Sequence, residues 1–236
     1  MDGDASQPHR PDRWARQRSE MVDRQLRDRG IRDERVLDVM RRLPREAFVP
    51  DEVRASAYAD EALPIGAGQT ISQPYMAARM SELLEPAPGK RILEIGTGSG
   101  YQAAILASLG CLVFSVERKP ELARAACDRL MAYGLAGNVE VEIGDGSAGR
   151  PDDGPFDGIV VTAAAPHVPP ALPSQLAPNG RLVVPVGRRD QQELLLIVRQ
   201  ADGFRQFDCG SCVFVPLVGE GGFREEAPPQ FLGRVL

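Results

Sequence analysis

The chain has 236 residues, a length that suits one α/β domain or one domain with an appendage. Its 43% apolar and 26% charged residues are typical of a globular protein, and no apolar run approaches the roughly 20 residues that span a bilayer. A net charge of −5 disfavours nucleic-acid binding, which usually requires a basic surface. We therefore expect neither a membrane nor a nucleic acid as a partner.

The N-terminal part begins with a polar stretch, residues 1–13, which lacks the apolar centre of a secretory signal and is expected to be a disordered tail. Residues 14–43 carry apolar side chains at helical spacing, interrupted by a glycine and a capping aspartate, so two helices are predicted. Residues 58–73 have no clear period and are interpreted as a long loop. A further helix is predicted over 74–84, with proline in its first turn.

Strand-like and helix-like segments alternate in the second half of the chain. This alternation predicts βαβ units and a doubly wound, mostly parallel sheet with helices on both faces, the Rossmann-like α/β class. No helix separates the last two strands, so we expect an antiparallel hairpin at one edge of the sheet. The predicted strands are 91–95, 111–117, 139–144, 156–164, 181–187, 192–198 and 212–218, and the predicted helices are 101–109, 120–133 and about 168–176.

These elements predict a single domain over residues 14–218. Its first part, 14–85, is expected to form a helical lid, and its second part, 86–218, the ligand-binding core. Residues 219–236 are interpreted as a C-terminal tail. The sequence shows no amphipathic stripe that demands a partner, so a monomer is expected.

The four cysteines do not predict a metal or redox site. Cys111 lies in a predicted strand and Cys127 in a predicted helix, so both are expected to be buried thiols. Cys209 and Cys212 form one C-x-x-C pair, which gives zinc too few ligands. A thioredoxin-type motif also requires a helix after the pair, and the residues that follow are strand-like.

The segment LEIGTGSGYQ, residues 93–102, lies between a predicted strand and a predicted helix. Gly96 and Gly98 match the first two glycines of the dinucleotide-binding fingerprint, but Tyr101 stands in place of its third glycine. Glu94 precedes the loop at the end of the strand. A carboxylate at that place disfavours a pyrophosphate and favours a cationic ligand.

Two more acidic residues end the next two strands. Glu117 follows Gly96 by 21 residues, the place from which an acidic side chain binds a ribose diol. Asp145 is suited to accept from an exocyclic amine, and Gly146 to offer its N–H to a purine. Together these residues predict S-adenosyl-L-methionine, a nucleoside with a positive charge and no phosphate. The alternative is that each carboxylate is an ordinary solvated cap of its strand.

Eight stretches of the chain together resemble one protein family over about residues 14–218. They are MVDRQLRDRGIRDERVLDVMRRLPREAFVP (21–50), YADEALPIGAGQTISQPYMAARMSELL (58–84), ILEIGTGSGYQAAILA (92–107), VERKPELA (116–123), GDG (144–146), PFDGIVVTAAAPHVP (155–169), GRLVVPVG (180–187) and VFVPLV (213–218). In these stretches the chain is similar to the protein-L-isoaspartate O-methyltransferases. The glycine motif is shared by all class I methyltransferases, whereas GQTISQP (68–74) is much more specific to this family.

The resemblance implies a cytoplasmic enzyme that transfers a methyl group from S-adenosyl-L-methionine to the free carboxylate of isoaspartyl residues. Such residues occur in damaged peptides and proteins, and the methylation starts their repair. The resemblance assigns the active-site hydroxyl to Ser72, which we interpret as positioning the substrate carboxylate. It also implies cofactor contacts, which we expect from Thr70, Ile71, Gln73, Ser99 and Arg118.

Several alternatives remain open from the residues themselves. Ser72 precedes a predicted helix and is also suited to cap it. The fold also suits a methyltransferase with another substrate, a non-enzymatic binding module, or a nicotinamide-dependent oxidoreductase, which Tyr101 disfavours. A carboxyl nucleophile with a pKa of about 4 is ionised at neutral pH, so no general base is expected. His9 lies in the tail, and His167 is expected on the surface of a loop.

Overall fold

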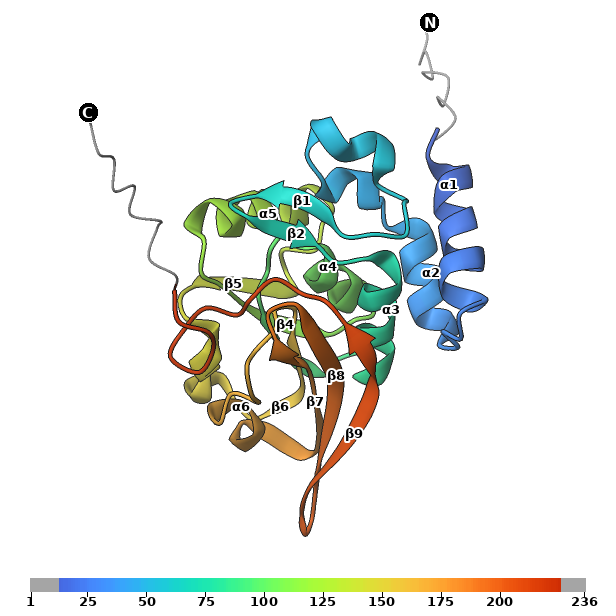
Figure 1. Cartoon of the computed structure of the whole chain (residues 1–236). Helices are drawn as coiled ribbons and strands as arrows, with labels where there is room; N and C mark the ends of the chain where they lie inside the picture. The colour runs from blue at the N-terminus through green and yellow to red at the C-terminus, as the bar shows by residue number, and fades with distance from the viewer. Residues whose placement is uncertain (1–12, 226–236) are drawn as a thin grey trace, which may run out of the picture.

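The computed structural model describes residues 13–225, which form a seven-stranded sheet, a separate two-stranded sheet and helices (Figure 1). The N-terminal tail expected over 1–13, apart from residue 13, and residues 226–236 of the expected C-terminal tail lie outside the described residues. Within the described part, no helix combines the length and apolar character needed to cross a membrane.

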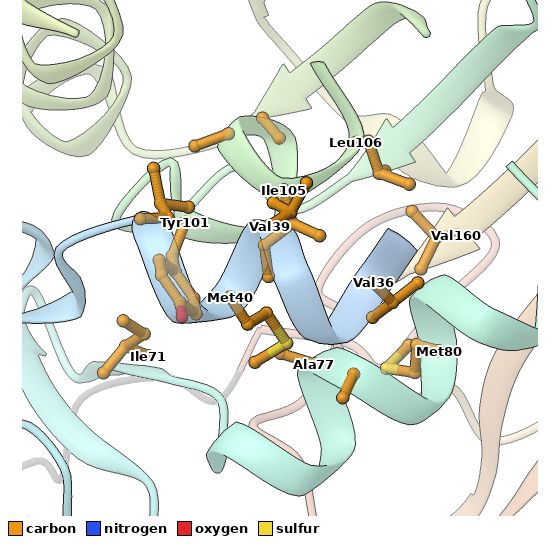
Figure 2. Close-up of a cluster of buried hydrophobic side chains, with 14 of the residues drawn as sticks. Val36, Val39, Met40, Ile71, Ala77, Met80, Tyr101, Ile105, Leu106 and Val160 are labelled. Atoms are coloured by element: carbon orange, nitrogen blue, oxygen red, sulfur yellow. The ribbon is translucent and has the colours of Figure 1, made fainter. Parts of the chain in front are cut away.

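The helices that precede the first strand of the large sheet, together with the next two helices along the chain, cover one face of that sheet. The structure has α1 (Ala15–Glu20) continuing into η1 (Met21–Arg27), then α2 (Glu34–Arg42), α3 (Pro74–Leu83), α4 (Tyr101–Ser108) and α5 (Pro120–Ala132). Asp33 caps α2 by accepting a hydrogen bond from the N–H of Arg35, as its sequence position predicts. Figure 2 shows α2 between α3 and α4, with Val39 and Met40 among the buried side chains that join the three helices.

The large sheet follows the order β5-β4-β3-β6-β7-β8-β9. Its strands are β3 (Arg91–Ile95), β4 (Leu112–Glu117), β5 (Val139–Ile143), β6 (Phe156–Val161), β7 (Leu176–Arg188), β8 (Gln191–Gln200) and β9 (Gly203–Cys212). The first five are parallel to one another, and β8 pairs antiparallel with both β7 and β9. The predicted doubly wound, mostly parallel sheet with an antiparallel edge is therefore confirmed.

The central strands of this sheet contribute to a buried cluster on each face, and successive side chains of a strand point to opposite faces. Ile92 of β3 belongs to the cluster under the large helical layer, and Leu93 belongs to the cluster on the other face. That second cluster includes Leu172 of the short helix α6 (Ala171–Ser174). Short 3-10 turns complete the fold: η2 (Arg45–Phe48), η3 (Asp51–Ser56), η4 (Gly146–Ala148) and η5 (Pro151–Asp153).

Residues 58–73 are not a loop, and the expectation was wrong at this place. They contain β1 (Leu63–Gly66) and β2 (Gln69–Ile71), an antiparallel hairpin set apart from the large sheet (Figure 1). Its turn uses Ala67 and Gly68 at positive φ. Each strand is too short to show a period, which is why the pattern of the sequence did not reveal the hairpin.

The last strand is also displaced from its expected place at 212–218. The antiparallel edge partner of β8 is β9, which ends at Cys212 where the predicted strand begins. Almost every side chain of β9 is at least partly exposed, so the strand has no apolar alternation to identify it. The apolar residues 213–218 instead form an extended segment that crosses the end of the sheet, where Pro216 bridges to Ala164 (Figure 1).

The order in which the chain adds strands to the sheet reverses its direction between β3 and β6. The chain builds β3, β4 and β5 outward in one direction and then returns to place β6 on the other side of β3. In open α/β sheets, a crevice for a ligand opens where the strand order reverses, outside the carboxyl ends of the strands. The loops after β3, β4, β5 and β6 all meet at this end.

Candidate active site

A cavity lies at the carboxyl ends of the parallel strands, beside the β1–β2 hairpin. Counted together with the adjoining space that is open to solvent, its volume is about 1060 Å³. Its wall combines the hairpin, the four loops after β3, β4, β5 and β6, and the segment that follows β9. The lining residues from these loops are Ile95–Ser99, Val116–Lys119, Gly144, Gly146, Thr162 and Ala163.

Most of the residues predicted from sequence lie on this wall. They are Thr70, Ile71 and Ser72 from the hairpin and its end, Gly96, Gly98 and Ser99 from the loop after β3, Glu117 and Arg118 after β4, and Gly146 after β5. Gln73, Glu94 and Asp145 are not among the lining residues. The cavity therefore brings together residues from as far apart in the chain as Ala67 and Glu225.

The glycine loop brings its backbone close to neighbouring elements. Gly96 has a φ of +96°, and a Cβ atom there would lie 2.5 Å from Oγ1 of Thr162. Gly146 is equally constrained, because a Cβ atom would lie 2.6 Å from Cγ2 of Ile95. Side chains at these two positions would displace the cavity wall, which is the physical reason for glycine at both.

The three glycine amides of this loop are already used within the protein. Gly96 N–H donates to the carbonyl of Val116, Gly98 N–H to the carboxylate of Glu117, and Gly100 N–H to the carbonyl of Thr97, each at 2.8 Å. A diphosphate at such a loop requires free N–H donors. The loop therefore suits a ligand without phosphate, in agreement with the interpretation of the sequence.

Of the three acidic residues predicted from sequence, Glu117 is the one that lies on the cavity wall. Its side chain is buried, and its two oxygens accept hydrogen bonds from the N–H groups of Gly98 (2.8 Å) and Lys119 (2.9 Å). An ionised carboxylate has about four lone-pair sites, so two remain for the hydroxyls of a ribose. The backbone bonds hold the carboxylate in place before a ligand arrives.

Glu94 does not line the cavity, although its place just before the glycine loop suggested a contact with the ligand. Its side chain is completely buried behind the glycine loop and accepts a hydrogen bond from the hydroxyl of Ser115. Burial raises the pKa of Glu94 to about 8, so the carboxyl is largely neutral at pH 7. The structure therefore does not support the expectation that the carboxylate of Glu94 attracts a cationic ligand directly.

Asp145 also does not line the cavity. Its two oxygens accept from the N–H groups of Ser147 (2.9 Å) and Glu220 (2.8 Å). Burial alone would raise the pKa of Asp145, but these backbone hydrogen bonds outweigh it and hold the pKa below its ordinary value. Asp145 thus fastens the segment after Val218 to the end of β5, and Gly146 is left facing the cavity.

Ser72 lies at the cavity, just before α3. The N-cap of α3 is Gln73, and no side chain makes a capping hydrogen bond to this helix. The helix-cap alternative for Ser72 therefore receives no support. Gln73 turns outward, where its amide nitrogen donates to the backbone carbonyl (3.0 Å) and carboxylate (2.9 Å) of Asp60.

Several lining residues were not identified from sequence. Thr162 donates to the carbonyl of Gly96 from the end of β6, and residues 215–218 line the cavity as an extended segment rather than as a strand. Glu225 also lines it, paired at 2.8 Å with Arg118. Contacts between segments this far apart leave no local pattern, although the similarity over VFVPLV pointed to the importance of 213–218.

The cysteines and histidine of the described part do not form a second centre. Cys111 and Cys212 are buried, Cys127 and Cys209 are half-buried, and all four are free thiols. Within residues 13–225, no group of three or more metal-ligating side chains is arranged to hold an ion. His167 is exposed on the loop after β6, as expected.

Comparisons with known proteins agree with this geometry. The profile of the protein-L-isoaspartate(D-aspartate) O-methyltransferase family (PCMT) matches residues 16–222. The protein-L-isoaspartate O-methyltransferase of Methanoculleus marisnigri is 51% identical over 214 residues, covering 91% of this chain and 97% of the relative.

Two solved structures share the fold over most of the chain. One protein-L-isoaspartate O-methyltransferase superposes with a TM-score of 0.77 at 29% identity, covering 87% of this chain and 67% of the other. A putative member from Plasmodium falciparum, in complex with S-adenosyl-L-homocysteine, gives a TM-score of 0.73 at 25% identity, covering 85% and 98%. With its doubly wound sheet and glycine-loop cavity, the chain belongs to the protein-L-isoaspartate O-methyltransferase family.

Proposed function

We propose that this enzyme transfers the methyl group of S-adenosyl-L-methionine to the free carboxylate of isoaspartyl residues in peptides and damaged proteins. One observation carries the proposal: a single cavity joins the glycine loop and Glu117 to Ser72 of the family-specific GQTISQP stretch. A donor site and an acceptor site therefore share one space, as direct transfer between two bound molecules requires.

The wall residues fit the cofactor. The glycine loop provides close backbone approach with its three glycine amides already hydrogen-bonded, which favours a nucleoside without phosphate. Glu117 has free acceptor capacity for the ribose hydroxyls, and Gly146 and the segment 215–218 line the remaining wall. When bound, the cofactor supplies a methyl group on a positively charged sulphur.

The protein is required to orient and desolvate the acceptor rather than to activate it. An isoaspartyl carboxylate has an ordinary carboxyl pKa near 4 and is ionised at neutral pH, so no base has to remove a proton. We assign to Ser72 a hydrogen bond from its hydroxyl to one oxygen of this carboxylate. We expect the β1–β2 hairpin, with Thr70 and Ile71 on the wall, to exclude water from the same space once both molecules are bound, which strengthens the nucleophile.

We further propose that the enzyme acts as a cytoplasmic monomer with one domain over residues 14–218. The continuous buried cluster that joins the N-terminal helices to the sheet supports one folding unit. Light scattering during size-exclusion chromatography tests the monomer, since a mass near twice 25.6 kDa would contradict it.

The decisive experiment compares matched peptides that contain either aspartate or isoaspartate at one position. With labelled S-adenosyl-L-methionine, the isoaspartyl peptide is expected to be methylated and the aspartyl peptide is not. Equal labelling of both peptides, or of neither, would contradict the proposed substrate.

Ser72→Ala tests the assignment of the hydroxyl. We expect kcat to fall by about 10-fold or more, since a hydrogen bond to a charged group contributes about 1.5–3 kcal/mol. The affinity for S-adenosyl-L-homocysteine should stay within about 2-fold, because that energy is specific to the acceptor. An unchanged kcat would remove Ser72 from the reaction.

A further inference from the structure

Arg45 is a completely buried arginine directly behind the acceptor end of the cavity. Its Nη2 donates to the backbone carbonyl of Ser72 at 2.7 Å, and its Nε donates to the carbonyl of Ala57 at 2.8 Å. Its guanidinium lies 5.1 Å from the centre of the Tyr101 ring. Ser72 and Tyr101 both line the cavity, so Arg45 supports two parts of one wall from behind.

The charge of Arg45 has no carboxylate partner within residues 13–225. Its hydrogen-bond acceptors are backbone carbonyls, and its Nη1 atom is buried without a hydrogen-bond partner. The next residue, Glu46, is engaged elsewhere, by the Arg18 guanidinium at 3.4 Å and by the hydroxyl of Tyr58. A buried charge is costly unless it is paired, so an arginine in this position is expected to act on an anion nearby.

The position of Arg45 connects this charge to the reaction. The acceptor of the proposed function is an anion, and Ser72 is the residue assigned to hold it. A fixed positive charge within a poorly hydrated wall favours an anion much more than the same charge in water. The hydrogen bond to the Ser72 carbonyl fixes the backbone from which the serine hydroxyl projects.

We infer that Arg45 is a positioning and specificity-determining residue for the methyl acceptor: it fixes Ser72 and provides the positive potential that selects an ionised carboxylate. The inference rests on the proposed function. It concerns the acceptor, since Arg45 contacts neither the glycine loop nor Glu117 through any hydrogen bond in the described structure.

The test measures selectivity for charge as well as rate. Wild type and Arg45→Met are compared for binding of an isoaspartyl peptide and of the same peptide with that carboxylate converted to the amide. We expect wild type to prefer the carboxylate by about 10-fold or more, corresponding to about 1.4 kcal/mol. Arg45→Met should lose this preference and raise the KM of the isoaspartyl peptide by a similar factor, while its S-adenosyl-L-homocysteine affinity stays within about 3-fold.

Two further variants separate this role from a general loss of stability. Arg45→Lys keeps the charge but loses the planar pair of donors, so it should show the preference for the carboxylate, while its kcat should fall below that of wild type because Ser72 is held less firmly. Arg91→Met is the matched control: Arg91 donates to the backbone carbonyl of Asp153 and packs 4.5 Å from the Phe114 ring, away from the cavity wall. It should lower stability without changing the preference or the KM.

The outcomes are distinct. A carboxylate preference that survives in Arg45→Met, or that Arg45→Lys fails to restore, overturns the inference while methylation by wild type leaves the proposed function intact. If Arg45→Met does not fold, Arg45→Gln, which also removes the charge, takes its place, and a carboxylate preference that survives in Arg45→Gln overturns the inference in the same way. If wild type methylates no isoaspartyl peptide, the proposed function fails and the inference fails with it.

Discussion

Replacing Gly96 by alanine measures how tightly the glycine loop is packed against the end of β6. The φ of +96° would cost a side-chain-bearing residue about 1–2 kcal/mol. The new Cβ atom would also lie 2.5 Å from Oγ1 of Thr162, and overpacking of this kind costs about 1–3 kcal/mol. We therefore expect Gly96→Ala to lower the free energy of unfolding by about 2–5 kcal/mol.

A double-mutant cycle with Thr162→Ala separates the two contributions. Removal of Oγ1 leaves the threonine Cβ position, 3.8 Å from the added atom, as the nearest side-chain contact. In that background Gly96→Ala should cost only the backbone strain, about 1–2 kcal/mol. Urea unfolding of the four proteins gives the coupling. If Gly96→Ala costs the same in both backgrounds to within about 0.5 kcal/mol, the reasoning from close approach is refuted.

Three further predictions concern titratable groups. Glu117→Gln should weaken S-adenosyl-L-methionine binding by about 10–100-fold in calorimetry, because hydrogen bonds to a charged group contribute about 1.5–3 kcal/mol, and a change under 3-fold would contradict its role. The folded pKa of Glu94, about 8, exceeds its ordinary 4.5, so its contribution to stability is present below pH 4.5 and lost as the pH rises to about 8. Glu94→Gln should therefore gain stability relative to wild type between urea titrations at pH 5 and pH 8, whereas a constant difference would contradict burial of this acid. The kcat for an isoaspartyl peptide should be nearly constant from pH 6 to 8, and a steep rise near pH 7 would reveal a base.

The central strands of the parallel core, β3 and β6, were predictable because they are largely apolar and buried on both faces, whereas the edge strand β5 was predictable from its alternation of apolar and acidic residues. The predicted strand 91–95 coincides with β3, and the predicted strand 139–144 exceeds β5 by one residue. The prediction failed where burial does not impose a period, at the β1–β2 hairpin and at the exposed edge strand β9. In these strands the structure depends on hydrogen bonds between backbones, so the sequence of side chains does not indicate it.

The functional residues also fall into those that the sequence indicated and those that it did not. Gly96, Gly98 and Glu117 were recognised because a strand, a turn and the next strand fix their spacing along the chain. Arg45 was missed because its hydrogen-bond partners are the backbone carbonyls of Ala57 and Ser72. Any residue type provides such a carbonyl, so the sequence does not indicate these contacts. Whole segments that resemble a family therefore identified the chemistry better than single side chains did.

The sequence by itself determined the class of sheet, the glycine loop and the family, since these follow from apolar periodicity, backbone demands on glycine and a specific stretch of residues. The tertiary structure decided which carboxylates face the ligand. Glu94, Glu117 and Asp145 all lie at or beside strand ends, but burial encloses the first and backbone amides hold the third. The direction in which a side chain points depends on neighbours distant in sequence, and these neighbours exist only once the chain has folded.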